Sequence, residues 1–176
     1  SSDTDLVGSA FELYGFDVDG VGDINGDGYA DVAVSAILAS AVYLYTGGPD
    51  GISQTAYGAL SAEGVGLGAS VAYAGDINGD TYPDIITGTS DQKAVVFYGT
   101  ADGPEANPGQ TITGPDGFGI SPASAGDLNR DGFGDVVIGA PGANMFFVYY
   151  GSADGLLESN PVSSVGSGSF GLSVAG

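Results

Sequence analysis

The amino-acid sequence predicts an all-β fold made of repeated four-stranded units. Three observations carry this prediction: a repeat of about fifty residues, an acidic loop in each repeat, and short runs rich in Val, Ile, Tyr and Phe between Gly, Asp and Pro. Runs of β-branched and aromatic residues bounded by turn formers are typical of strands. A four-stranded unit repeated radially is the blade of a β-propeller. We therefore expect propeller-type blades and essentially no helix.

Each repeat opens with a large apolar residue followed by Gly. These openers lie 53, 51 and 52 residues apart, at Tyr14-Gly15, Leu67-Gly68, Phe118-Gly119 and Phe170-Gly171. A fixed period of this length indicates a repeat architecture. The predicted units are residues 14–66, 67–117 and 118–169 of a single repeat domain that covers residues 1–176.

One extra strand is expected at each end, at about Gly8–Leu13 within residues 1–13 and at Phe170–Gly176. Closed propellers need at least about four blades. Three units therefore predict an open arc, a fragment of a longer propeller, or a ring completed by a neighbour.

An acidic loop follows each of the first three openers and has oxygen-bearing side chains at its first, third, fifth and ninth positions. The three copies consist of Asp23, Asn25, Asp27, Tyr29 and Asp31; of Asp76, Asn78, Asp80, Tyr82 and Asp84; and of Asp127, Asn129, Asp131, Phe133 and Asp135. Calcium takes about six to eight oxygen ligands from flexible loops. We predict about three calcium ions, one per loop, bound by these side chains and by the backbone carbonyl of the seventh residue.

Other interpretations of the loop are weaker. An EF-hand needs a carboxylate at the twelfth position, where the sequence has Val34, Thr87 and Ile138. Zinc is disfavoured because the chain has no His or Cys. The structural alternative is that the Asp and Asn side chains only form Asx-turns. Three loops in register favour a cation, because neighbouring carboxylates repel one another.

The second loop differs from the others at its sixth position. Thr81 stands where the other loops have Gly28 and Gly132. A turn at this position asks for a positive φ, which is costly for a β-branched residue. We expect the second loop to be the weakest site.

The rest of each unit has the pattern of two more strands. Aromatic-rich runs lie at residues 41–47, 94–100 and 145–151, and each leads to an Asp-Gly pair, at 50–51, 102–103 and 154–155. A closing stretch such as 52–60 or 110–113 completes the unit.

The third unit resembles the FG-GAP repeats of the integrin α-subunit propeller and of related bacterial secreted proteins. It contains the whole signature in order: Phe118-Gly119, the loop Asp127–Asp135, and Gly139-Ala140-Pro141. The other two units contain the loop, but their flanking motifs match the signature less well. The resemblance implies a secreted or cell-surface protein in which the loops fix the geometry of the blades.

The charge balance limits the partners. The chain has 22 acidic residues against only Lys93 and Arg130, a net charge of −20. Nucleic acids and anionic membranes bind proteins with clustered Lys and Arg side chains, which this chain lacks. Neither is therefore an expected partner. No apolar run approaches the roughly 20 residues of a membrane span, so no membrane insertion is expected.

Catalysis is not expected either. A chain without His or Cys would have to use carboxylates, Ser, Tyr or its two bases. A carboxylate pair such as Asp17 with Asp19 or Glu63 is formally available. Such acids are commonplace in so acidic a chain, and we predict no enzyme.

The function predicted is a calcium-dependent structural or adhesion module. Calcium would make the blades rigid for interaction with an extracellular protein or glycan, or with copies of the chain through its terminal strands. One alternative is a carbohydrate-binding module that uses the aromatic residues Tyr29, Tyr82 and Phe133 beside the loops. Another is a non-catalytic appendage of a larger secreted enzyme.

Overall fold

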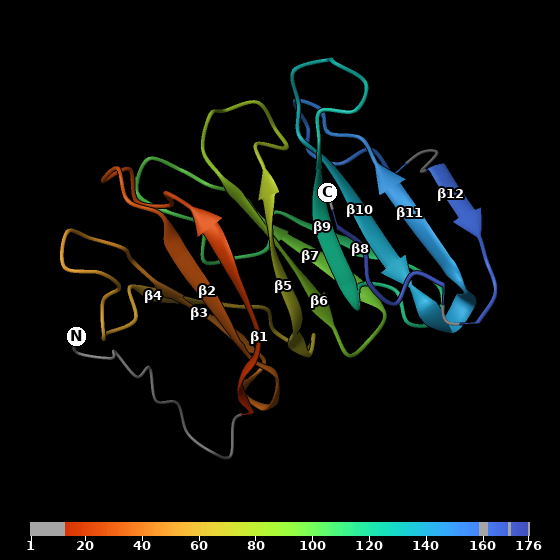
Figure 1. Ribbon diagram of the computed structural model, residues 1–176, viewed down its shortest axis with the longest axis horizontal. Coiled ribbons are helices and arrows are strands. Elements are labelled where there is room, and N and C mark those ends of the chain that lie inside the picture. Colours follow the sequence, from red (N-terminus) through yellow and green to blue (C-terminus); the bar gives the residue numbers. More distant parts are fainter. Residues whose placement is uncertain (1–12, 159–161, 169, 176) are drawn as a thin grey trace.

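The computed structural model describes residues 13–158, 162–168 and 170–175. In this part of the chain, twelve strands form three four-stranded antiparallel sheets that lie side by side (Figure 1). Each sheet is a meander of consecutive strands, and nothing closes the described arc into a ring. The sheets are propeller-like blades, as the sequence predicted.

The three blades have similar bounds. Blade 1 contains β1 (Tyr14–Gly22), β2 (Asp31–Ala36), β3 (Ala41–Tyr45) and β4 (Gly58–Ser61). Blade 2 contains β5 (Leu67–Gly75), β6 (Asp84–Thr89), β7 (Lys93–Phe97) and β8 (Gln110–Thr113). Blade 3 contains β9 (Ser121–Gly126), β10 (Asp135–Ala140), β11 (Met145–Tyr149) and β12 (Val162–Val165). The helical content of the described residues is limited to two short 3₁₀ turns, η1 (Ile37–Ala39) and η2 (Pro141–Ala143).

The two strands expected at the ends of the chain are not seen as strands in the described residues. Residues 8–12 lie outside the described part, and Leu13 is in a turn. Residues 170–175 form turns and irregular backbone, so the prediction of a strand at Phe170–Gly176 is wrong for these residues. They nevertheless contact blade 3: Phe170 packs on Phe146, and Val174 donates its N–H to Ser121 Oγ at 3.1 Å. This segment has no second strand to pair with among the described residues, which explains why it forms no ladder.

The first and second strands of each blade are joined by the acidic loop, and an irregularity in pairing starts each loop. Gly22 pairs with Asp31, Gly75 with Asp84 and Gly126 with Asp135, each next to a shift in register. All three glycines have positive φ (76°, 83° and 67°), a backbone conformation that other residues adopt at a cost. The strand end thereby fixes where the first carboxylate of the loop lies.

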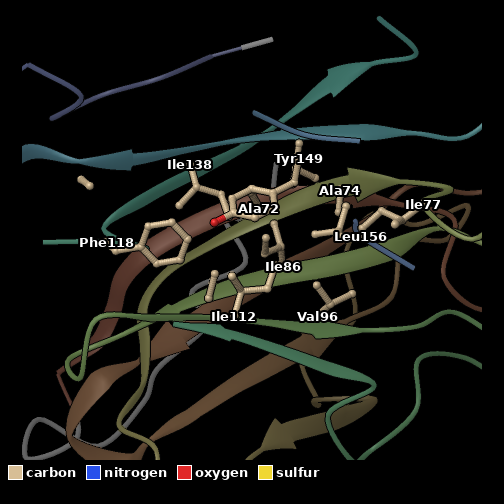
Figure 2. Packing of buried hydrophobic residues seen from close by; sticks show 13 residues of the cluster. Ala72, Ala74, Ile77, Ile86, Val96, Ile112, Phe118, Ile138, Tyr149 and Leu156 are labelled. Carbon is tan, nitrogen blue, oxygen red and sulfur yellow. The ribbon is translucent and has the colours of Figure 1, made fainter. Parts of the chain in front are cut away.

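The hydrophobic core consists of two layers between the blades. One layer packs blade 1 on blade 2 and includes Val42, Leu44, Leu67 and Phe97. The other packs blade 2 on blade 3, where Figure 2 shows Ile86, Val96 and Ile112 facing Phe118, Ile138 and Tyr149. Each such side chain contributes about 1.5–3 kcal/mol when fully buried. The relative position of the loops therefore depends on packing between blades.

The first strands of neighbouring blades are also joined by hydrogen bonds. Asp17 Oδ2 accepts from the N–H of Val71 at 2.8 Å, and Asp19 Oδ2 accepts from the N–H of Tyr73 at 2.9 Å. These carboxylates line a hollow of about 650 Å³ formed by β1, β5, β9 and the segment near Leu172. The contacts give Asp17 and Asp19 a structural role.

Candidate metal centre

The three acidic loops, loop 1 (residues 23–31), loop 2 (76–84) and loop 3 (127–135), share one backbone conformation. Positive φ occurs at the fourth position, in Gly26, Gly79 and Arg130 (74°, 76° and 62°). It occurs again at the sixth position, in Gly28, Thr81 and Gly132 (89°, 78° and 93°). The expectation that Thr81 adopts positive φ is confirmed. Two left-handed residues in quick succession turn the chain sharply, and the side chains of the first, third and fifth residues bond to groups within the turn.

Hydrogen bonds inside loop 1 bring its first, third and fifth side chains together. The N–H of Asp27 donates to both Asp23 Oδ1 and Asn25 Oδ1, each at 3.0 Å. Asp23 Oδ2 accepts from the N–H of Gly28 at 2.8 Å. Asp27 accepts from Asn25 Nδ2 and from the N–H of Tyr29, both at 2.9 Å. Three oxygen-bearing side chains are thus held around one short segment of backbone.

Loops 2 and 3 repeat the same bonds. Asp80 donates its N–H to Asp76 Oδ1 and Asn78 Oδ1, both at 3.0 Å. Asp131 donates to Asp127 Oδ1 and Asn129 Oδ1, both at 3.1 Å. The structure therefore brings together the first, third and fifth predicted site residues in every loop.

The ninth-position carboxylates are buried and have different partners. Asp31, Asp84 and Asp135 are 0% exposed. Asp31 Oδ2 accepts from the N–H of Ile24 at 2.8 Å, and its Oδ1 accepts from the N–H of Gly47 at 2.7 Å. The other two carboxylates make the same pair of bonds, Asp84 with Ile77 and Gly99 and Asp135 with Leu128 and Gly151. The ninth side chain thus ties the start of its loop to the turn after the third strand.

The glycines in these turns are site residues that the sequence reasoning missed. A side chain at Gly47, Gly99 or Gly151 would collide with the carbonyl of the eighth loop residue, which is Ala30, Pro83 or Gly134. The signal was present in the repeat, since each aromatic-rich run has a Gly at or next to its last residue. Only Gly lets the turn approach the loop closely enough to donate to the ninth carboxylate.

Burial and neighbouring charge raise the pKa of two ninth-position carboxyls. Desolvation is the main cause and raises the pKa of Asp84 to about 6, although the amides of Gly99 and Ile77 oppose the shift. The charges of Asp80 and Asp76 raise the pKa of Asp84 further. Burial also raises the pKa of Asp31, with contributions from Asp27 and Asp23. The first and fifth carboxylates thus repel the ninth.

The chemistry of the loops fits a hard cation. Their side-chain donors are all oxygens, and each carboxylate has about four lone-pair positions, more than the hydrogen bonds use. No group of three or more Asp, Glu, His or Cys side chains in the described residues is arranged to hold a metal ion. The carboxylates alone do not form a cage, because the ninth one is occupied by buried amides. A site here needs the Asn oxygen and main-chain carbonyls as well.

The seventh residues differ in their surroundings. Tyr29 is 43% exposed and Tyr82 is 38% exposed. Phe133 instead lies across the boundary between blades, because a Cβ added at Gly79 of loop 2 would lie 2.7 Å from its ring. The three residues predicted as one aromatic set therefore have two different roles.

The contact between loops 2 and 3 also differs from the contact between loops 1 and 2. Loops 2 and 3 are joined directly, because Gly134 donates its N–H to the carbonyl of Asp76 at 2.7 Å. The equivalent residue of loop 2 is Pro83, which has no N–H to donate. A hollow of about 410 Å³ separates loops 1 and 2, and Tyr73, Tyr82 and Pro83 line it.

Comparison with known proteins explains the repeated loop. A family model described as FG-GAP-like repeat matches residues 23–87 and 76–138, which is more than half of the chain. The chain belongs to the FG-GAP-like repeat family. Both matches run from the first residue of one acidic loop into the second strand of the next blade, so each match contains two acidic loops.

Relatives of this FG-GAP-like chain include integrin α-subunits. It is 31% identical to integrin alpha-PS5 of Drosophila melanogaster and 32% identical to integrin alpha-IIb of Mus musculus, over 72% and 73% of its length. It is 39% identical to integrin alpha-7 of Homo sapiens over 63% of its length. These matches cover only 15%, 15% and 11% of the relatives. Among the described residues, no helix has the length and apolar character needed to cross a membrane.

Proposed function

We propose that this chain is a non-catalytic, adhesion-type module of an extracellular or cell-surface protein, and that its loops bind calcium. The observation that carries the proposal is the threefold recurrence of one loop geometry, in which the side chains of the first and third residues both accept from the backbone amide of the fifth. The family relationship to integrin α-subunits supports the adhesion-type assignment.

The proposed ligands are the residues predicted from the sequence. In loop 1, oxygens of Asp23, Asn25 and Asp27 would bind the ion with the carbonyl of Tyr29, and Asp31 would contribute a lone pair that its two hydrogen bonds leave free. Loops 2 and 3 offer equivalent donors. Bound calcium would offset the repulsion among carboxylates, which adds to burial in raising the pKa of Asp31 and Asp84.

The buried ninth carboxylate connects the loop to the rest of its blade, so calcium bound in the loop would also stabilise the blade. Asp31 bonds Gly47 across 16 residues, so it links the loop to the turn between β3 and β4. An ion that orders the loop would therefore also order the far side of the same sheet. Rigid blades would then present surface loops to an extracellular protein partner.

Titration calorimetry with calcium chloride tests the proposal. We expect three sites in the intact chain and the loss of one in Asp27→Asn. A matched control is Asp50→Asn, which makes the same change in an exposed turn outside the loops and should leave three sites. Absence of calcium binding, or three unchanged sites in Asp27→Asn, would refute the proposed metal centre.

A second candidate function is glycan binding at the hollow between loops 1 and 2. The half-exposed rings of Tyr73 and Tyr82 line this hollow, and sugars commonly stack on exposed aromatic rings. Phe133 does not join them, because it packs on Gly79. A glycan array on which Tyr82→Ala abolishes binding would favour this function, whereas no binding by the intact chain would exclude it for the glycans tested.

Self-association is a further candidate for the partner. Leu128 is 55% exposed, although the equivalent residues Ile24 and Ile77 are 3% and 0% exposed beneath the next blade. The free face of blade 3 thus has an apolar residue at a position that is normally covered. Light scattering on the intact chain and on Leu128→Asp would detect an oligomer and its loss, and a monomer at high concentration would dismiss the idea.

A further inference from the structure

The third-position asparagines of the loops differ in the residue that follows them. Asn25 precedes Gly26 and Asn78 precedes Gly79, whereas Asn129 precedes Arg130. A glycine leaves its backbone nitrogen open to the preceding side chain, because it has no Cβ to hinder the approach. The three loops therefore form an internal comparison for one reaction, the spontaneous deamidation of asparagine.

We propose that Asn25 is a site of spontaneous deamidation and that Phe133 restrains the same reaction at Asn78. The backbone nitrogen of Gly26 loses its proton and forms a bond to Cγ of Asn25. The bond from Cγ to Nδ2 breaks, and the side-chain nitrogen leaves as ammonia. Water then opens the five-membered imide at either carbonyl and gives aspartate or isoaspartate. The net change consumes one water and releases one ammonia.

The first step needs the side-chain amide of Asn25 to leave its present contacts. Its Oδ1 accepts from the N–H of Asp27 at 3.0 Å, and its Nδ2 donates to Asp27 Oδ2 at 2.9 Å. Asn78 makes the same two bonds with Asp80, and Asn129 makes them with Asp131. These bonds are common to the three sites, so they do not set the order of the deamidation rates. In loop 2 the N–H of Gly79, whose nitrogen must react, also donates to Asp76 Oδ1 at 2.7 Å, which further restrains the Asn78 site.

The surroundings of the residue after each asparagine set the order of the deamidation rates. No atom outside the two neighbouring residues lies within 4 Å of a Cβ built on Gly26, so this side of loop 1 is open. The ring of Phe133 lies against the same position of Gly79, and loop 2 is further held by the bond from Gly134 to Asp76. The Asn78 side chain therefore has less freedom to rearrange. Arg130 has a side chain of its own, which makes Asn129 the slowest site.

The products would alter loop 1 in two ways. Aspartate at position 25 cannot donate to Asp27, so a hydrogen bond becomes a contact between two carboxylates. Isoaspartate adds one carbon to the backbone and changes the spacing of the loop. The deamidation itself goes beyond the proposed function and does not require calcium, whereas an effect on calcium affinity rests on the proposed metal centre.

Peptide mapping by mass spectrometry tests the inference on the intact folded chain. The chain is incubated in mildly alkaline buffer with EGTA, and conversion is measured at each asparagine. We expect Asn25 to convert several-fold faster than Asn78, with Asn129 slowest. No conversion at Asn25, or equal rates at Asn25 and Asn129, would overturn the assignment. Conversion of Asn78 as fast as Asn25 would overturn the role of Phe133.

Two variants make the test independent of folding artefacts. Phe133→Ala should raise the rate at Asn78 several-fold toward that of Asn25, with circular dichroism used to confirm that the chain is folded. Arg130→Gly should make Asn129 convert at a measurable rate, and this variant suits its position because φ is 62° there. An unchanged rate at Asn129 in Arg130→Gly would show that the following residue does not control the reaction. Because calcium is absent throughout, these results do not depend on whether the loops bind it.

Discussion

The N–H of Gly134 in loop 3 donates to the main-chain carbonyl of Asp76 in loop 2 at a distance of 2.7 Å. The bond crosses the boundary between blades 2 and 3. No such bond is available between blades 1 and 2, where Pro83 occupies the equivalent position and a hollow separates the loops. Loops 2 and 3 therefore form a joined pair, and loop 1 stands apart.

Removing this donor should weaken the boundary between blades 2 and 3. Gly134→Pro deletes the N–H, and we expect a loss of about 1–2 kcal/mol in the free energy of unfolding. Gly134→Ala is the matched control, because it keeps the N–H while adding a Cβ that would lie 3.0 Å from the carbonyl oxygen of Asp76. Urea denaturation should show the proline variant to be the less stable of the two. Equal stability would mean that the hydrogen bond contributes little.

Thr81→Gly should stabilise the chain. Thr81 is β-branched and has φ of 78°, a conformation that costs it about 1–3 kcal/mol and costs glycine almost nothing. Part of the gain is offset because glycine has more freedom in the unfolded chain. We expect a net gain of about 1 kcal/mol by urea denaturation and tighter calcium binding at one site by calorimetry. The reverse substitution Gly132→Thr should lose stability, and a neutral result for both would contradict the strain argument.

The ninth carboxylates should matter for stability even without calcium. In Asp135→Asn, an amide NH₂ must face the N–H of Leu128 or of Gly151, because both oxygens of Asp135 accept from these amides. A buried donor without an acceptor costs about 1–3 kcal/mol. Denaturation in EGTA should show this loss. Asp131→Asn, at the exposed fifth position, should cost less under the same conditions, and the opposite ranking would contradict the structural role of Asp135.

Close packing between the blades should make Gly88 intolerant of a side chain. A Cβ at this position would collide with the carbonyl oxygen of Gly119 in the next blade and with Ser70 Oγ. We expect Gly88→Ala to destabilise the chain by about 1–3 kcal/mol, the usual cost of overpacking. Gly58→Ala is the control, since no atom lies within 4 Å of its added Cβ. Equal melting temperatures for the two variants would show that the blades can move apart without cost.

The local parts of this structure were predictable from the sequence, because each repeat repeats the same local signals. The Gly, Asp and Pro punctuation predicted four strands per unit, and the spacing of Asp76, Asn78 and Asp80 predicted three side chains that gather in the loop. The positive φ of Thr81 was predicted from the glycines at equivalent positions.

What the sequence could not predict depends on contacts between distant segments. The partner of Asp31 is the amide of Gly47, which only the folded sheet brings close. Leu128 has the same place in the pattern as Ile24 and Ile77, yet it is exposed because no described blade covers it. The opener at Phe170 has the same pattern as the other openers, but a strand forms only where a second strand pairs with it.

Calcium binding by the folded loops should raise the melting temperature of the intact chain. An ion that binds only the folded chain stabilises it by about 2.7 kcal/mol per site at a hundredfold excess over Kd. Melting is followed by calorimetry or circular dichroism in excess EGTA and in millimolar calcium, with magnesium at equal ionic strength as the control. We predict a melting temperature many degrees higher in calcium than in EGTA, with magnesium giving a smaller rise. Identical melting temperatures in calcium and EGTA would contradict calcium binding by the folded loops.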